Sequence, residues 1–148
     1  MSDPVTIGRL YGRRAGHKLR EGQAALVEDL LPRLSVPDGP LDATKLFGKA
    51  CPLELEIGFG GGEHLAGQAA MRPDTGFIGC EPFLNGVVGA LNHIQDGGHS
   101  NIRLHMGDAL DVLLLQLHIR HPSRWPTGVW VLQKIHQTLE TVFLVQRA

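Results

Sequence analysis

The sequence has little of several features that mark specialised proteins. Its 148 residues include only two cysteines, Cys51 and Cys80, whose spacing fits neither a disulfide framework nor a metal site. Free cysteines suit a reducing compartment, so we expect a cytoplasmic protein. No apolar run approaches membrane-spanning length, and the residues after Met1 lack the apolar region of a secretion signal. We therefore expect neither a membrane partner nor a bound metal.

The overall charge is close to neutral. A net charge of -1 argues against a protein that binds nucleic acid over its whole surface, although a local basic patch is compatible with it. A hydrophobic content of 43% is enough for a core, and the length makes one folded domain the default.

Strand and helix patterns alternate in the middle of the chain. Leucines at helical spacing first predict a helix from about Leu19 to Leu34, which Pro32 ends or bends. Three strand–helix pairs then follow, with strands at 53–57, 76–80 and 101–105 and helices at 63–71, 83–95 and 109–118. This alternation is typical of a parallel sheet with crossover helices, so we predict an α/β, Rossmann-like core.

The C-terminal part follows this pattern less clearly. After a loop at 121–126 we predict strands at 129–132 and 142–145, with a short helix between them. The chain is thus expected to comprise a basic segment and helix at 1–40, an α/β core at 41–118 and a divergent tail at 119–148.

The most informative segment reads Leu-Glu-Ile-Gly-Phe-Gly-Gly-Gly, at residues 55–62. Glu56 lies near the end of a predicted strand, and Gly58, Gly60 and Gly62 alternate in the turn after it. Alternating glycines let the backbone turn tightly and pass close to a ligand. The spacing differs from the Gly-x-Gly-x-x-Gly of dinucleotide-binding folds, because an acidic residue stands where the last glycine would be. An acid before alternating glycines suits S-adenosylmethionine, which carries an ammonium group and no pyrophosphate.

An acidic residue stands at the end of each predicted core strand. Glu56 suits a ligand amino group, Glu81 suits both ribose hydroxyls, and Asp108 suits the adenine amino group. Each also has a simpler interpretation. Glu56 could be a helix-capping or surface acid, Glu81 a loop acid before Pro82, and Asp108 the N-cap of the next helix. Nicotinamide-binding folds use an acid in the same way as Glu81, so this residue alone does not identify the cofactor.

Basic residues gather at the start of the chain. Five of its 14 Lys and Arg residues fall within residues 1–20. Such a run is usually a solvated surface, but arginines beside tyrosine and glycine also suit contacts to a phosphate backbone. The candidate nucleic-acid contacts are Arg13, Arg14, His17 and Arg20.

The other histidines carry no clear signal. His64 follows the glycine turn and is expected only to pack locally. Those that show no metal-ligand spacing, and are expected on the surface or in the core, are His93, His99, His105 and His136.

Four blocks resemble the bacterial tRNA (guanine-N7)-methyltransferases, which modify guanosine 46 of the tRNA variable loop. They read Tyr-Gly-Arg-Arg-x-Gly-His-x-Leu-Arg from 11, Leu-Glu-Ile-Gly-Phe-Gly-x-Gly-Glu-His-Leu from 55, Phe-Ile-Gly-Cys-Glu-Pro-Phe-Leu-Asn-Gly from 77, and Asn-Ile-Arg-Leu from 101 followed by Gly-Asp-Ala from 107. Together they span about residues 9–117. The resemblance implies a class I methyltransferase fold that binds S-adenosylmethionine through the three acids and the glycines, with the basic block near tRNA.

The resemblance ends near residue 117. The family continues with a fourth strand that ends in Pro-Asp-Pro-Trp, and a Thr-Asp motif near the guanine follows later. Residues 119–148 contain neither motif, and the closest echo, Pro-Ser-Arg-Trp-Pro at 122–126, has Ser123 in place of the aspartate. We therefore expect the C-terminal part of the family to be missing or replaced, and we name no catalytic residue.

Three hypotheses follow from the sequence. The first is a tRNA guanine-N7 methyltransferase, and the second is a non-catalytic remnant of that family that binds the cofactor or tRNA. The third, a nicotinamide-binding domain, is disfavoured by the glycine spacing.

Overall fold

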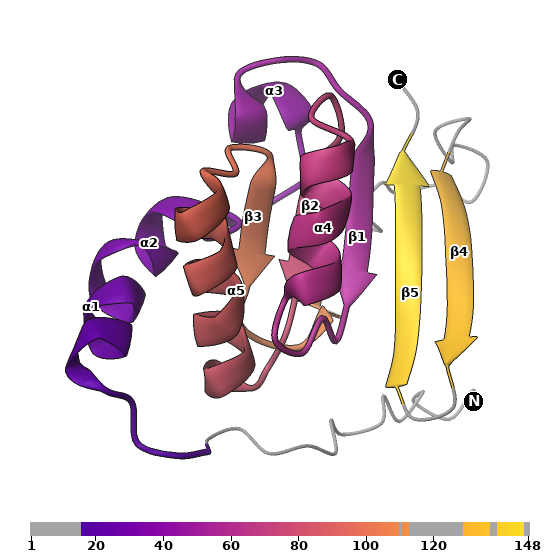
Figure 1. Ribbon diagram of the computed structural model, residues 1–148. Coiled ribbons are helices and arrows are strands. Elements are labelled where there is room, and N and C mark those ends of the chain that lie inside the picture. The colour runs from indigo at the N-terminus through magenta and orange to yellow at the C-terminus, as the bar shows by residue number, and fades with distance from the viewer. Residues whose placement is uncertain (1–15, 110, 113–128, 137–138, 147–148) are drawn as a thin grey trace, which may run out of the picture.

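The computed structural model describes residues 16–109, 111–112, 129–136 and 139–146. A five-stranded sheet in the order β3-β2-β1-β5-β4 forms its centre (Figure 1). The strands are β1 Leu53–Ile57, β2 Gly76–Cys80, β3 Ile102–His105, β4 Val129–His136 and β5 Leu139–Gln146. Strands β1, β2 and β3 are parallel, whereas β5 is antiparallel to both β1 and β4. The predicted parallel α/β core is therefore confirmed, with strand bounds close to those expected.

Five named helices accompany the sheet: α1 Glu21–Asp29, α2 Leu31–Leu34, α3 Ala43–Phe47, α4 Glu63–Met71 and α5 Leu84–Gly97. The predicted N-terminal helix divides at Leu30, and Pro32 lies in the first turn of α2, where its missing N–H is tolerated. Helix α3 was not predicted, although its signal is present. Asp42 accepts a hydrogen bond from the Lys45 amide at its start, and Gly48 ends it with φ +73°.

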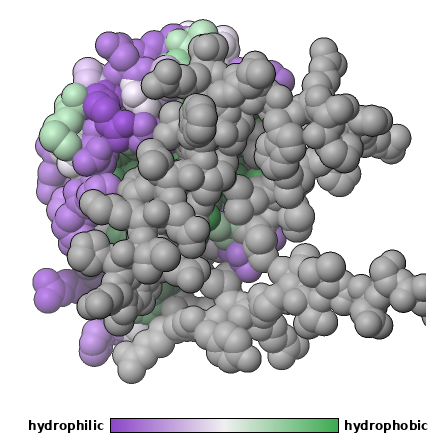
Figure 2. Space-filling model, turned by 90° about the vertical axis from the view of Figure 1, so that its right-hand side faces the viewer, coloured by the Kyte–Doolittle hydropathy of each residue, from purple (hydrophilic) through white to green (hydrophobic). Residues whose placement is uncertain are grey.

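Hydrophobic residues of the core strands pack on both faces of the sheet. Phe77 of β2 belongs to one cluster, with residues of α4 and α5, while its neighbour Ile78 belongs to another, with Leu46 of α3. This alternation follows from the two-residue period of a strand. Figure 1 shows α4 and α5 lying together over one face, and Figure 2 shows mainly hydrophilic residues on the outer surface of the coloured part.

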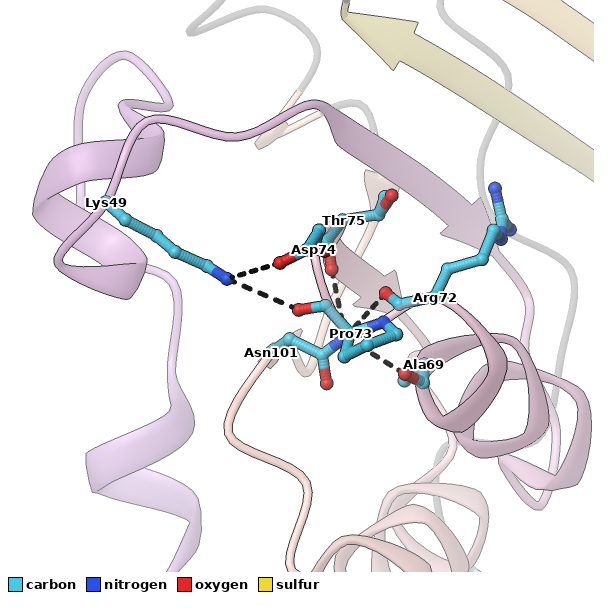
Figure 3. Close-up of polar contacts among 7 residues, drawn as sticks. All are labelled: Lys49, Ala69, Arg72, Pro73, Asp74, Thr75 and Asn101. Atoms are coloured by element: carbon cyan, nitrogen blue, oxygen red, sulfur yellow. Dashed lines mark hydrogen bonds and ion pairs between the residues drawn. The ribbon is translucent and has the colours of Figure 1, made fainter.

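One buried side chain fastens α4 to the loops around it. Asn101, 8% exposed, precedes β3 and points its amide nitrogen at the end of α4 (Figure 3). Its Nδ2 lies 3.1 Å from the carbonyl oxygen of Ala69, 3.2 Å from that of Arg72 and 2.9 Å from that of Thr75. The two hydrogens of Nδ2 are shared among these three oxygens, of which the Ala69 carbonyl is one that the end of α4 leaves without a helical partner. Nearby, Lys49 Nζ pairs with Asp74 Oδ1 at 3.2 Å.

The C-terminal part differs from its prediction. Residues 129–136 and 139–146 are two long strands that pair from Val129↔Gln146 to His136↔Leu139, so the short helix predicted between them is wrong. The mistake came from the short apolar runs, whose period was ambiguous; pairing along the whole of both strands settles the backbone as extended. Helix is described at 109 and at 111–112, and the rest of the predicted helix 109–118 and the loop 121–126 lie outside the described residues.

Candidate cofactor site

A glycine turn joins β1 to α4 at the carboxyl end of β1. Gly58, Gly60 and Gly62 have φ values of +70°, +59° and +84°, which only glycine adopts readily. Among the described residues, a Cβ added at Gly58 or Gly60 would meet nothing within 4 Å, whereas one at Gly62 would lie 2.6 Å from Ala90 Cβ. The first two glycines therefore face open space beside the turn, and the third is needed for close packing on α5.

Glu81 ties this turn to the loop after β2. It is 8% exposed, and both carboxylate oxygens accept backbone hydrogen bonds. Oε2 accepts from Gly60 N and Oε1 from Phe83 N, each at 2.9 Å. The Gly58 amide also donates to the Cys80 carbonyl at 2.7 Å. The turn is thus held by charged and backbone acceptors from the neighbouring strand, and each Glu81 oxygen keeps a further lone pair.

Two glycines of α5 lie directly against the glycine turn. The sequence analysis did not single them out. A Cβ at Gly86 would lie 2.4 Å from the Gly60 carbonyl oxygen, and one at Gly89 would lie 2.7 Å from the Gly61 carbonyl oxygen. Their spacing of three residues was the signal that could have found them, because it places both on the same face of the helix. Their lack of side chains lets the turn lie directly on the helix.

Glu56 is buried beside the turn. It is 5% exposed, and His64, near the start of α4, places Nδ1 3.1 Å from its Oε2. Burial raises the pKa of the Glu56 carboxyl, while the hydrogen bond and charge of His64 lower it. Among the described residues, the other oxygen, Oε1, has no hydrogen-bond partner. The expectation that His64 only packs locally therefore understated its role.

Asp108 follows β3 at the same edge of the sheet. Burial raises the pKa of the Cys80 thiol to about 12, with further contributions from the negative charges of Asp108 and then Asp111. This places Asp108 within electrostatic reach of the end of β2. The structure therefore brings Glu56, Glu81 and Asp108 to the carboxyl ends of three adjacent parallel strands, where open α/β sheets bind ligands.

The basic segment is fastened to the same region by a contact that the sequence did not reveal. Asn85 Oδ1 accepts from Gly16 N at 2.9 Å, and its Nδ2 donates to the His17 carbonyl at 3.1 Å. A Cβ at Gly16 would lie 2.7 Å from both Asn85 Oδ1 and the Phe83 ring, so a side chain there would displace one of these two residues. His17 therefore lies next to the loop after Glu81.

The remaining predicted nucleic-acid contacts lie apart from the turn or outside the described chain. Arg20 lines a groove of about 680 Å³ between α1 and α5, together with Arg33 and Asp29. Arg13 and Arg14 are not among the described residues.

The acids at this edge fit S-adenosylmethionine better than a dinucleotide. A buried carboxylate attracts an ammonium group and accepts from hydroxyls, but it repels a pyrophosphate. Glu56 Oε1 and the spare lone pairs of Glu81 supply such acceptors beside the open glycines. Within the described ranges, no group of three or more His, Cys, Asp or Glu side chains could hold a metal ion. No helix in the same part is long and apolar enough to cross a membrane.

Comparison with known proteins agrees with this arrangement. A family model described as "Putative methyltransferase" matches residues 50–123. The tRNA (guanine-N(7)-)-methyltransferase of Zymomonas mobilis is 60% identical over 132 residues, covering 84% of this chain and 57% of the relative. The proteins of that name from Novosphingobium aromaticivorans and Erythrobacter litoralis are 55% and 52% identical, each again matching 84% of this chain and covering 58% and 57% of their own lengths.

The chain thus spans a little over half the length of these curated relatives. The family match includes the glycine turn and all three acids, which are the parts that the sequence motifs singled out. This chain therefore belongs to the family of the tRNA (guanine-N7)-methyltransferases.

Proposed function

We propose that this chain binds S-adenosylmethionine at the carboxyl edge of its parallel strands and acts in the methylation of guanosine 46 at N7 in the tRNA variable loop. The observation that carries the proposal is the meeting of Glu56, Glu81 and the open glycine turn at one edge. The names of the relatives supply the reaction. Such a protein works in the cytoplasm, where tRNA is modified.

Each part of the site has a role in this proposal. Glu56 pairs with the cofactor's amino group, Gly58, Gly60 and Gly62 let the backbone approach it, Glu81 accepts from the ribose hydroxyls, and Asp108 accepts from the adenine amino group. The cofactor supplies a methyl group on a positively charged sulfur. Guanine N7 already has a free lone pair, so no residue has to remove a proton to create the nucleophile. Catalysis then rests on positioning and on a negative environment for the charge left on the base.

The N-terminal segment is the proposed contact to tRNA. Arg13, Arg14, His17 and Arg20 supply positive charge for phosphates, and Asn85 fastens the described end of this segment beside the cofactor loop. Binding through such contacts should weaken steeply as the salt concentration rises.

A second function, a non-catalytic protein that binds cofactor or tRNA, is favoured by one observation. Residues 119–148 lack the Pro-Asp-Pro-Trp and Thr-Asp motifs, and the strand next to β1 is antiparallel. In the usual Rossmann order this place belongs to a fourth parallel strand. We therefore expect cofactor binding to outlast catalysis in this chain.

Two measurements test the proposal: the first tests the cofactor, and the second separates the enzyme from the non-catalytic protein. Calorimetric titration should detect binding of S-adenosylhomocysteine and none of NAD; the reverse result would overturn the cofactor assignment. Labelled S-adenosylmethionine with unmodified tRNA then measures methylation, read by reductive cleavage at N7-methylguanosine. We expect very weak or no methylation compared with a full-length relative. Turnover equal to that relative would show that the C-terminal residues rebuild the guanine site.

A further inference from the structure

Helix α4 places a basic side chain against each of two acids on β1. Glu54 and Glu56 are two residues apart in the strand and so lie on the same face. Arg72, just after α4, contacts both carboxylate oxygens of Glu54, with Nη2 at 2.7 Å from Oε2. His64, near the start of α4, contacts one of the two oxygens of Glu56, Oε2, at 3.1 Å.

The two pairs differ in what they leave available. A guanidinium that contacts both oxygens satisfies and neutralises its carboxylate, so Glu54 serves the structure. An imidazole offers a single hydrogen at Nδ1. An ionised carboxylate only accepts hydrogen bonds, so Nδ1 must carry a proton in this contact. Oε1 then remains for a ligand.

The burial of Glu56 makes this partner necessary. Burial raises the pKa of the Glu56 carboxyl, and a protonated carboxyl would lose its attraction for an ammonium group. The acids near Glu56 cannot take over the hydrogen bond that His64 donates. Glu81 accepts from the Gly60 amide of the turn, and Glu63 lies 3.9 Å from His93 on α5.

We propose that His64 is a positioning residue for the cofactor's amino group: its Nδ1–H fixes Oε2 of Glu56 so that Oε1 faces the ligand as an ionised acceptor. This inference rests on the proposed function, because it assigns the ammonium end of S-adenosylmethionine to Glu56. It adds a residue that touches Glu56 and is not itself required to touch the ligand.

Three substitutions at His64 test this role. Asn places its amide nitrogen where Nδ1 of the imidazole lies, Gln places it one carbon farther out, and Ala removes it. By calorimetry, His64→Ala and His64→Gln should weaken S-adenosylhomocysteine binding by about tenfold, as expected for loss of a hydrogen bond to a charged group. His64→Asn should stay within about twofold of the unchanged chain. The matched control is His93→Ala, another half-exposed histidine, on α5, which should leave binding unchanged.

A second measurement reads Glu56 directly, without ligand. Carbon NMR of labelled glutamate carboxyls should show a higher pKa for Glu56 in His64→Ala and His64→Gln than in the unchanged chain, and a smaller rise in His64→Asn, which keeps the hydrogen bond to Glu56. Equal affinity and an equal Glu56 pKa in all His64 variants would overturn the positioning role alone. Absence of binding by the unchanged chain would instead overturn the proposed function, and the cofactor role of His64 with it.

Discussion

Glu81 is the side chain whose removal should affect both the fold of the site and its ligand. Its two oxygens accept hydrogen bonds from Gly60 N and Phe83 N at 2.9 Å, and the residue is buried. A carboxylate has about four lone-pair positions, so two remain for two ribose hydroxyls. Replacement by Ala removes the charge and all four positions, whereas Gln keeps one oxygen and turns an N–H group toward one of the two amides.

The expected size follows from this count. A hydrogen bond to a charged acceptor contributes about 1.5–3 kcal/mol, and water will satisfy part of what Glu81→Ala exposes in this partly buried loop. We therefore expect Glu81→Ala to lower the free energy of unfolding by about 2–4 kcal/mol and Glu81→Gln by about half as much. Both should weaken S-adenosylhomocysteine binding, the alanine variant by at least about tenfold.

Urea unfolding and calorimetry on the same samples measure the two effects. Glu63→Ala is the matched control, because this acid begins α4 close to the turn yet its side chain is 75% exposed. It should leave both quantities nearly unchanged. An unfolding free energy that Glu81→Ala does not lower would refute the view that this carboxylate holds the turn, and an unchanged dissociation constant would remove Glu81 from the site.

Three other predictions concern stability and order. Asn101→Ala should lower the free energy of unfolding in urea by about 2–3 kcal/mol, since buried carbonyls lose their donor, and a loss near zero would contradict the contacts seen. Asn85→Ala should release the segment at Gly16, so trypsin should cleave the basic segment faster, while Asn92→Ala on the same helix should not change the rate. Burial raises the pKa of the Glu56 carboxyl, so the folded chain binds a proton there more tightly than the unfolded chain, and stability is lost as pH rises through the folded pKa. Glu56→Gln should therefore be more stable than the unchanged chain near neutral pH, with a difference that shrinks as pH falls toward 4.5, and a variant less stable at neutral pH would refute this sign.

The sequence predicted the parts of the fold that depend on local pattern. Apolar runs bounded by turn residues indicated β1, β2 and β3, and an acid at the end of each strand indicated the edge where Glu56, Glu81 and Asp108 stand. Parallel strands connected by helices have few possible arrangements, so local pattern was enough to place these residues together.

Contacts between distant segments could not be predicted in this way. The bond between Gly16 and Asn85 joins two sequence blocks that are each recognisable, but nothing in either block says that they meet. The packing of Gly86 on the turn depends on how closely α5 approaches, which no periodicity measures. The helix wrongly predicted between the last two strands failed for a related reason, because long-range pairing overrides the weak local preference of short apolar runs.

The pairing of β5 also decides what the C-terminal residues bring to the site. Phe143 pairs with Glu56 and Gln146 with Leu53, so the earlier residues of β5 run past the carboxyl end of β1. Three residues of extended strand span roughly 10 Å, so residue 140 lies beyond the last residue of β1, at the end of the sheet where the glycine turn begins. Because β4 is antiparallel to β5, its carboxyl end returns to that same edge, as Figure 1 shows. The sequence of residues 112–148 holds a single acidic side chain, Glu140, and the register pairs this residue with Ile135 in the hairpin. A parallel fourth strand would end at this edge, whereas β5 begins there. The edge is therefore extended by a hairpin in place of a strand end.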